Sequence, residues 1–285
     1  MQELVKITEC PRDAMQGITP FIPTQDKIRY HNALLKCGFD ILDFGSFVSP
    51  KAIPQMKDTA EVLEQLQLEN THTKLLAIVG NMRGAQEACQ QEKISFLGFP
   101  FSFSPTFLER NINSTVEQSF DSVKRMLETC KAHNKSLRVY ISMAFGNPYG
   151  DPWGTEMLLH WIDQLHWIGV RHIVLADTTS EAEDSAIRAS LQTALPAYAE
   201  VNFGLHLHTT SEDWKQKIDA AYQTGCRHFD GVLHGLGGCP MAGPDLVGNI
   251  RTRDLLNFFG KKEMRMNINL EALEKARQVA EEILP

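Results

Sequence analysis

The stretch "TEMLLHWIDQLHWIGVRHIVLAD" (residues 155–177) joins a helix-like segment to a strand-like segment, and this pairing decides the fold. Apolar residues recur at helical spacing over 155–169, and the segment ends in Gly169, a residue type that is common just after helices. Residues 171–177 form a short apolar run, which predicts a buried strand. Together they form the repeating unit of an α/β fold with a parallel sheet.

The same alternation extends in both directions along the chain. Seven further runs are strand candidates, at residues 4–10, 39–45, 74–80, 94–99, 137–145, 201–208 and 228–234. Helical patterns lie between them, for example at 115–133 and 212–225. Eight strands that alternate with helices predict a parallel sheet covered by helices, either closed as a barrel or open as a doubly wound sheet.

Two observations favour the closed barrel. An open dinucleotide-binding sheet normally carries a GxGxxG turn after its first strand, whereas "PRDAMQG" (11–17) follows the first strand here. The 285 residues also suit a (β/α)₈ barrel, which needs roughly 250. No repeat or linker divides the chain, so we expect one catalytic domain over residues 1–285, a TIM barrel with an additional C-terminal helix at 270–284.

Composition limits the partners and the compartment. A net charge of −7 argues against nucleic acid and against anionic membranes, because both attract basic proteins. The first ten residues contain no apolar signal segment, and no window approaches 18 uninterrupted apolar residues, so we expect a cytoplasmic protein. The six cysteines form no CxxC pair, which indicates reduced thiols.

The run "GLHLH" (204–208) places two histidines one residue apart at the end of a predicted strand. Residues two apart share one face of a strand, so the imidazoles of His206 and His208 can converge on one ion. Taken alone, such a pair is more often a pair of hydrogen-bonded polar side chains than a metal site.

Other polar residues also lie at the carboxyl ends of predicted strands or in the loops that follow them. In a barrel the chemistry lies at the carboxyl ends of the strands and in the loops that follow them. The polar residues at these ends are Arg12, Asp13, Asp43, Asp177, His206, His208, Cys239 and Asn249. Two imidazoles, a carboxylate and an amide oxygen favour an octahedral divalent cation, Mg²⁺ or Mn²⁺ rather than Zn²⁺.

Several motifs carry a resemblance to a known family. They are "ECPRDAMQ" (9–16), "DFGSFVSPKAIPQM" (43–56), "RNINSTVEQSF" (110–120), "AFGNPYGDP" (144–152), "GLHLH" (204–208) and "GLGGCP" (235–240) followed by Asn249. Over nearly the whole chain they resemble the hydroxymethylglutaryl-CoA lyases, within the superfamily of metal-dependent lyases and Claisen-condensing barrels. The resemblance implies that the metal ligands are Asp13, His206, His208 and Asn249.

The implied activity is the cleavage of 3-hydroxy-3-methylglutaryl-CoA to acetyl-CoA and acetoacetate, as in leucine degradation. The cation would lower the pKa of the substrate hydroxyl, and Arg12 would face the thioester oxygen as charge builds there. Cys239 would protonate the enolate carbon. The base is Asp43, Asp177 or a water on the ion. The expected partner is a small acyl-CoA substrate, and a homodimer is compatible with the sequence.

Four departures from the lyase pattern keep alternatives open. Asp43 stands where these lyases usually carry glutamate, Ala14 replaces a glycine, Thr209 replaces an aspartate, and "TSEAEDS" (179–185) replaces a glycine-rich loop. One alternative is a related aldolase or Claisen-condensing synthase for another acyl-CoA or hydroxyacid. A second is a barrel that binds acyl-CoA without turnover. For Arg12 the structural alternative is an ion pair with Asp13 or Asp43.

Overall fold

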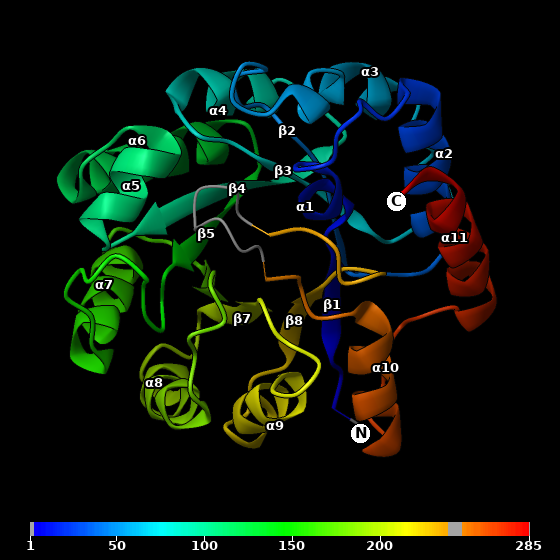
Figure 1. The fold of residues 1–285 in the computed structure, drawn as a ribbon. Helices are drawn as coiled ribbons and strands as arrows, with labels where there is room; N and C mark the ends of the chain where they lie inside the picture. The colour runs from blue at the N-terminus through cyan, green and yellow to red at the C-terminus, as the bar shows by residue number, and fades with distance from the viewer. Residues whose placement is uncertain (1–2, 239–246, 285) are drawn as a thin grey trace.

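The computed structural model describes residues 3–238 and 247–284. Eight parallel strands form a closed barrel in the order of the chain, with β8 beside β1 (Figure 1). Their bounds are β1 Lys6–Glu9, β2 Ile41–Ser46, β3 Lys74–Ile78, β4 Ile94–Ser102, β5 Ser136–Ser142, β6 His172–Asp177, β7 Asn202–Leu207 and β8 His228–Gly231. The pairing of β1 with β8 from Lys6 and His228 to Glu9 and Gly231 closes the ring.

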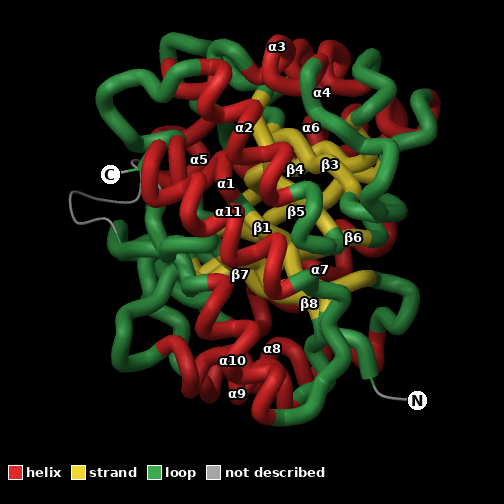
Figure 2. The backbone as a smooth tube through the Cα atoms, turned by 90° about the vertical axis from the view of Figure 1, so that its right-hand side faces the viewer, coloured by secondary structure: helices red, strands yellow, loops and turns green. Residues whose placement is uncertain are grey.

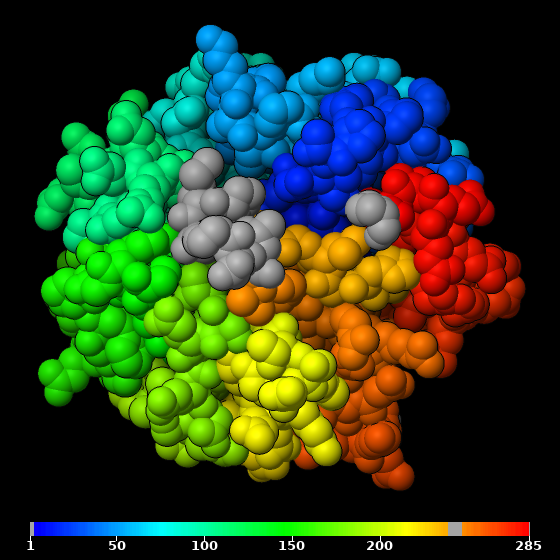
Figure 3. All heavy atoms as spheres, viewed as in Figure 1, coloured from blue at the N-terminus to red at the C-terminus, as the bar shows by residue number. Residues whose placement is uncertain are grey.

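Helices are arranged in a ring around the barrel (Figure 1), and the side view shows several of them in front of, above and below the strands (Figure 2). Their bounds are α1 Pro11–Met15, α2 Thr24–Leu34, α3 Thr59–Glu64, α4 Met82–Cys89, α5 Pro105–Ile112, α6 Val116–Ala132, α7 Thr155–Trp167, α8 Asp184–Ala197, α9 Trp214–Gln223, α10 Thr252–Lys261 and α11 Leu270–Ile283, with a 3₁₀ turn at Pro54–Met56. The additional C-terminal helix, α11, packs against α2, so a late segment of the chain lies beside an early one (Figure 3). Within the described ranges no helix is both long and apolar enough to cross a membrane.

Side chains alternate between the inside of the barrel and the layer under the helices. One apolar cluster inside the barrel is formed by Ile41, Leu76, Tyr140 and Val174. A much larger cluster fills the space between the strands and the helices, with Phe99, Phe101 and Phe229 among its fully buried members. The inside of the barrel is therefore a packed core and not an open pore.

The predicted fold class and all eight predicted strands are confirmed, and only their ends differ. The strand expected at 228–234 ends at Gly231, because Val232 leaves the ladder and pairs with Arg251 beyond the next loop. The strand expected at 94–99 continues to Ser102, because its last residues stay in register with β5.

Candidate active site

Arg12 and Asp13 are held at the carboxyl end of the barrel by a short helix. Pro11 occupies the first position of α1 directly after β1, where its fixed backbone angle and missing N–H suit the start of a helix. The turn leaves Arg12 only 9% exposed and Asp13 only 5% exposed. Ala14, which stands where the lyases usually have glycine, lies in the same helix and packs beside Cys10 and Val232.

The structure brings Asp13, His206 and His208 together. One ligand atom from each of the three side chains lies within 4.8 Å of the other two, and all three residues are buried. The two imidazole rings lie 5.3 Å apart between their centroids. His206 is in β7, and His208 follows the end of that strand, so the predicted shared face of the histidine pair brings both to Asp13.

Each ring is oriented by a hydrogen bond at its Nδ1 atom. His206 Nδ1 lies 3.4 Å from a carboxylate oxygen of Asp230, and His208 Nδ1 donates to the carbonyl of Val247 at 2.8 Å. With both Nδ1 atoms engaged in this way, both Nε2 lone pairs are available to a ligand. The geometry therefore suits two neutral imidazole ligands beside one carboxylate.

The pKa shifts favour the ligating forms of His208 and Asp13, whereas that of His206 favours its protonated form. Burial, with His206 nearby, lowers the pKa of His208 to about 4, so its ring is neutral at pH 7. Burial alone would raise the pKa of Asp13, but Arg12 and the two histidines outweigh it and lower that pKa below its usual value. Burial disfavours charge on His206, yet the hydrogen bond to Asp230 and the charge of Asp13 raise its pKa overall.

Asn249 reaches the same place from the loop after β8. It pairs with His208 in an isolated β-bridge, and its amide nitrogen donates to the carboxylate of Asp13 and to the carbonyl of Leu236, the latter at 3.0 Å. The structure thus places Asn249 beside the expected ligands but presents its NH₂ group there. Rotation of the amide would present the oxygen instead.

Gly237 shows why the loop after β8 needs glycine at this position. Its φ of +99° disfavours other residues, and a Cβ there would lie 2.7 Å from the Asn249 amide nitrogen and 2.9 Å from an Asp13 carboxylate oxygen. The loop backbone therefore lies directly against the site. Cys239, the expected proton donor in this loop, lies outside the described residues.

Arg12 is locked in an ion-pair network. Its guanidinium donates to Asp43 through Nε at 3.0 Å and Nη2 at 2.5 Å, and through Nη1 to Asp13 at 3.0 Å and Gln16 at 2.9 Å. These bonds use four of the five N–H groups of an arginine, leaving one on Nη2 without a partner in the described part of the chain. Burial alone would lower the pKa of Arg12, but Asp43 and Asp13 outweigh it and raise that pKa.

The two carboxylates expected as base candidates lie in different places. Asp43 is buried against Arg12, and burial raises its pKa although Arg12 opposes the shift. Asp177 does not reach the site: its carboxylate accepts from Lys217 Nζ at 3.0 Å and from the backbone amides of Glu181 and Ala182 at 2.9 and 3.1 Å. Its neighbour in β6, Ala176, faces the cavity instead, and alternation along the strand turns Asp177 toward the helices.

Sequence reasoning missed Asp230, Arg138 and Gln16. Asp230 faces into the barrel from β8, pairs in register with His206, and accepts from Arg138 Nη2 at 2.6 Å. Gln16 bridges Arg12 and Asp13, donating to the latter at 2.7 Å. The detectable signal for Asp230 was its alternation with His228 on the strand beside the histidine pair.

A cavity of about 420 Å³ opens beside these residues. Its volume lies within the range of ligand pockets, roughly 300–1,000 Å³. Its lining includes Arg12, Asp13, His206 and His208, together with residues of the segment after β2 and of the end of α5. Apolar side chains such as Ile53, Ile78 and Phe107 alternate there with polar groups, so the cavity can hold a substrate with both apolar and charged parts.

Comparisons with known proteins extend over almost the whole chain. A family model described as HMGL-like matches residues 5–280. The chain is 31% identical over 275 residues to hydroxymethylglutaryl-CoA lyase YngG of Bacillus subtilis (strain 168), covering 95% of this chain and 90% of that protein. It is 29% identical over 283 residues to (R)-citramalyl-CoA lyase of Chloroflexus aurantiacus, covering 96% of this chain and 88% of that protein.

A solved structure has the same fold over almost the whole chain. It is an HMG-CoA lyase from Acinetobacter baumannii in complex with coenzyme A and 3-methylmalate, with a TM-score of 0.90 and 30% sequence identity. The match covers 99% of this chain and 91% of that one. Each of these matches covers more than nine-tenths of the chain.

Proposed function

The chain belongs to the HMGL-like family, and from this premise we propose that it is a metal-dependent carbon–carbon lyase that cleaves 3-hydroxy-3-methylglutaryl-CoA to acetyl-CoA and acetoacetate. The observation that carries the proposal is the convergence of Asp13, His206 and His208 beside Arg12 in the lining of the cavity. The nearly full-length similarity to hydroxymethylglutaryl-CoA lyases supports the substrate.

The residues fit a divalent cation. Asp13, His206 and His208 would hold it, with the amide oxygen of Asn249 as a fourth ligand after rotation of that side chain. Nitrogen and oxygen donors without sulfur favour Mg²⁺ or Mn²⁺ over a tetrahedral Zn²⁺ site. When bound, such an ion supplies Lewis-acid polarisation of the substrate hydroxyl and of one substrate carboxylate oxygen.

Arg12 stabilises the negative charge that develops on the thioester oxygen. Its one remaining Nη2–H is available to that oxygen, and Asp43, Asp13 and Gln16 fix the guanidinium plane so that little reorganisation is needed. Of the two carboxylates expected to take the hydroxyl proton, Asp43 is the one in contact with a residue of the cavity wall. Its raised pKa suits a proton acceptor.

Cys239 remains the proposed donor of the proton that converts the enolate of acetyl-CoA into product. The proposal rests on the loop sequence "GLGGCP" and on the approach of Gly237 to the site. We also place the activity in leucine degradation in the cytoplasm, where thiols stay reduced, and a homodimer is compatible with the sequence.

A product-resolved assay tests the function. Purified protein with Mg²⁺ or Mn²⁺ should release acetoacetate and acetyl-CoA in equal amounts from 3-hydroxy-3-methylglutaryl-CoA, and chelation of the metal should abolish turnover.

Arg12→Lys should lower kcat by roughly 10²–10³-fold, because a single ammonium cannot reproduce the fixed fork of donors. Asp177→Asn should change kcat far less, since that carboxylate is turned away from the cavity. Metal-loaded, folded protein without turnover would contradict the proposal.

A second substrate is the main alternative, because the citramalyl-CoA lyase is nearly as similar as the hydroxymethylglutaryl-CoA lyase. The same assay should therefore compare kcat/KM for 3-hydroxy-3-methylglutaryl-CoA and citramalyl-CoA. A higher value for citramalyl-CoA would retain the lyase chemistry and replace the substrate. Tight acyl-CoA binding in calorimetry without cleavage of either compound would favour a barrel that only binds.

A further inference from the structure

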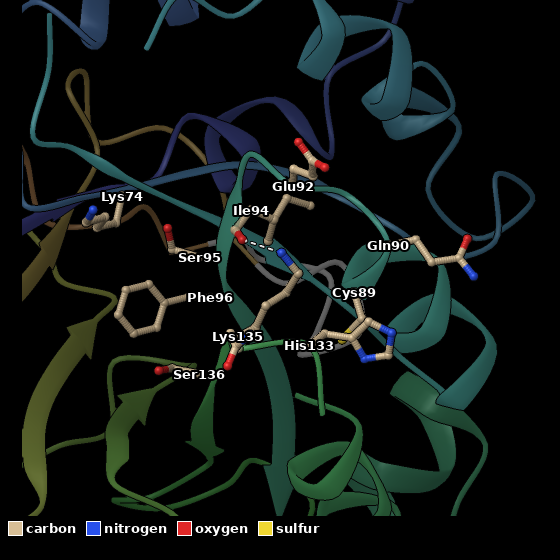
Figure 4. Close-up of a pocket in the computed structure, with 11 residues that line it drawn as sticks. Lys74, Cys89, Gln90, Glu92, Ile94, Ser95, Phe96, His133, Lys135 and Ser136 are labelled. Atoms are coloured by element: carbon tan, nitrogen blue, oxygen red, sulfur yellow. Dashed lines mark hydrogen bonds between the residues drawn. The ribbon is translucent and has the colours of Figure 1, made fainter. Parts of the chain in front are cut away.

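A second cavity lies at the opposite end of the barrel from the candidate active site. Its volume is about 650 Å³, and it opens where β3, β4 and β5 begin, near Lys74, Ile94 and Ser136 (Figure 4). None of its lining residues lines the first cavity. Cys89, from the last turn of α4, lies in its wall beside His133, which follows the end of α6.

Cys89 has a second thiol as its partner. Cys130 lies in the last turn of α6, the helix that packs against α4, and the two thiols are hydrogen-bonded to each other. Cys130 is completely buried, whereas Cys89 is 3% exposed and borders the cavity. Cys89 therefore borders the cavity, and Cys130 lies in the buried layer between α4 and α6.

Two basic residues, His133 and Lys135, line the same cavity as Cys89. His133 Nδ1 is held at the carbonyl of Thr129, 2.9 Å away, which leaves Nε2 as the free ring nitrogen. The Lys135 ammonium is fixed in the cavity wall by the carbonyls of Gln91 and Ile94, each 2.7 Å away. A thiol next to basic groups in a partly open pocket is the environment of a reactive cysteine rather than a structural one.

The shifts in pKa of the two thiols also favour Cys89 as the reactive one. The hydrogen bond from Cys130 outweighs burial and, with His133 and Lys135, lowers the pKa of Cys89 to about 7. That contact and burial raise the pKa of Cys130. Burial raises the pKa of Cys37 to about 12 and that of Cys226 to about 11, so these two cysteines are suitable internal references.

We propose that Cys89 and Cys130 form a redox-active dithiol, with Cys89 as the site of oxidation by a small hydroperoxide and Cys130 as the thiol that completes a disulfide. The Cys89 thiolate attacks one oxygen of the hydroperoxide, so that an S–O bond forms, the O–O bond breaks, and the alcohol or water leaves with a proton. Cys89 is then a sulfenic acid. The Cys130 sulfur attacks it, an S–S bond forms, and water leaves. Two thiols are oxidised by two electrons and one hydroperoxide is reduced.

The narrow exposure of Cys89 selects the class of oxidant. A cysteine residue that is only 3% exposed admits a molecule of the size of hydrogen peroxide more readily than a bulky disulfide such as oxidised glutathione. Because the cavity lies at the far end of the barrel, this chemistry is independent of the lyase proposal, and its failure would leave that proposal unaffected.

Thiol labelling and peptide mapping of the full-length protein test the proposal. At pH 7, iodoacetamide should modify Cys89 at least about tenfold faster than Cys37 or Cys226, because the larger thiolate fraction outweighs the lower nucleophilicity of a low-pKa thiolate. After hydrogen peroxide treatment, digestion without reductant should yield a peptide pair joined through Cys89 and Cys130. Cys130→Ala should remove that cross-link, slow the labelling of Cys89, and leave a sulfenic acid at Cys89 that dimedone traps.

Cys226→Ala is the matched control, since it removes another buried cysteine far from the dithiol and should leave the cross-link intact. Circular dichroism establishes that each variant is folded before it is labelled. Labelling of Cys89 in the folded wild type at the rate of Cys226 would overturn the proposal. So would peroxide treatment that oxidises other thiols and yields no joined Cys89–Cys130 peptide.

Discussion

Asp230 orients one of the proposed metal ligands. Its carboxylate accepts from Arg138 and lies 3.4 Å from His206 Nδ1, which leaves the Nε2 atom of that ring available as a ligand atom. Burial alone would raise the pKa of Asp230, but Arg138 and His206 hold it well below its usual range. A fixed anion behind an imidazole increases its basicity as a ligand.

Asp230→Asn should therefore weaken Mn²⁺ binding by about 10–100-fold, the usual effect of removing a group that orients a ligand. Calorimetric titration of the folded protein with Mn²⁺ measures the change. Asp121→Asn is the control, because Asp121 is in an exposed ion pair with Lys124. Equal Mn²⁺ affinity of Asp230→Asn and wild type would show that Asp230 does not support His206.

Glu9 is a buried carboxyl group outside the proposed chemistry. It accepts from the Leu233 amide at 2.7 Å and from the Thr252 hydroxyl at 2.5 Å, and it is completely buried. Burial outweighs these hydrogen bonds and raises its pKa to about 8 from an ordinary value of 4.5. Its protonated form is thus favoured by folding, and the resulting stability is full below pH 4.5 and is lost as the pH rises through 8.

Glu9→Gln keeps the shape and removes the titration. Relative to wild type, the variant should gain on the order of 4 kcal/mol in free energy of unfolding between pH 5 and pH 9, since each pKa unit corresponds to about 1.4 kcal/mol. Urea unfolding of both proteins at several pH values measures this difference. Parallel pH profiles for the two proteins would contradict the assignment.

At the scale of single elements, α6 shows how local sequence fixes a boundary. Thr115 Oγ1 accepts from the Gln118 amide at 3.3 Å, and the Gln118 side chain accepts from the Thr115 amide at 3.2 Å, which forms a capping box. This box satisfies two N–H groups at the start of the helix. The helix then runs from Val116 to Ala132 and places Cys130 against α4.

Thr115→Ala should lower the free energy of unfolding by about 1 kcal/mol through loss of the cap. Thr129→Ala is a matched control in the same helix, because the Thr129 hydroxyl only donates to the Arg125 carbonyl and alanine is the better helix former. Urea unfolding compares the two variants. A loss for Thr115→Ala no larger than that for Thr129→Ala would contradict the role of the cap.

At the scale of the whole molecule, a polar network crosses the inside of the barrel. Arg138 of β5 donates to Thr8 of β1 at 2.9 Å and to Asp230 of β8 at 2.6 Å. Gly204 of β7 makes room for it, since a Cβ there would lie 3.2 Å from Arg138 Nη2. The network thus joins strands that are distant in sequence, directly beneath the candidate active site.

Arg138→Met should lower the free energy of unfolding by about 3–5 kcal/mol, because it leaves Asp230 buried without its cation. Lys124→Met removes one partner of an exposed pair and should cost less than about 1 kcal/mol. Denaturant titration measures both variants. A similar small loss for the two would show that the internal pair contributes little to the closed barrel.

The sequence by itself determined the alternation of helices and strands, the closed barrel, and the meeting of Asp13 with His206 and His208. These follow from local periodicity and from the rule that parallel strands present their carboxyl ends at one edge. Residue spacing also put Asp177 at that edge, but the register of β6 on β7, in which Ala176 pairs with His206, turns Asp177 outward to Lys217.

Only the tertiary structure decided which side chains touch across the barrel and between its helices. The contact of Asp230 with His206 depends on the register of two neighbouring strands, and the contact of Cys89 with Cys130 depends on how α4 packs on α6. The physical reason is that periodicity is a property of a few consecutive residues. A contact between distant residues is set by the packing of whole elements, which no short stretch of sequence contains.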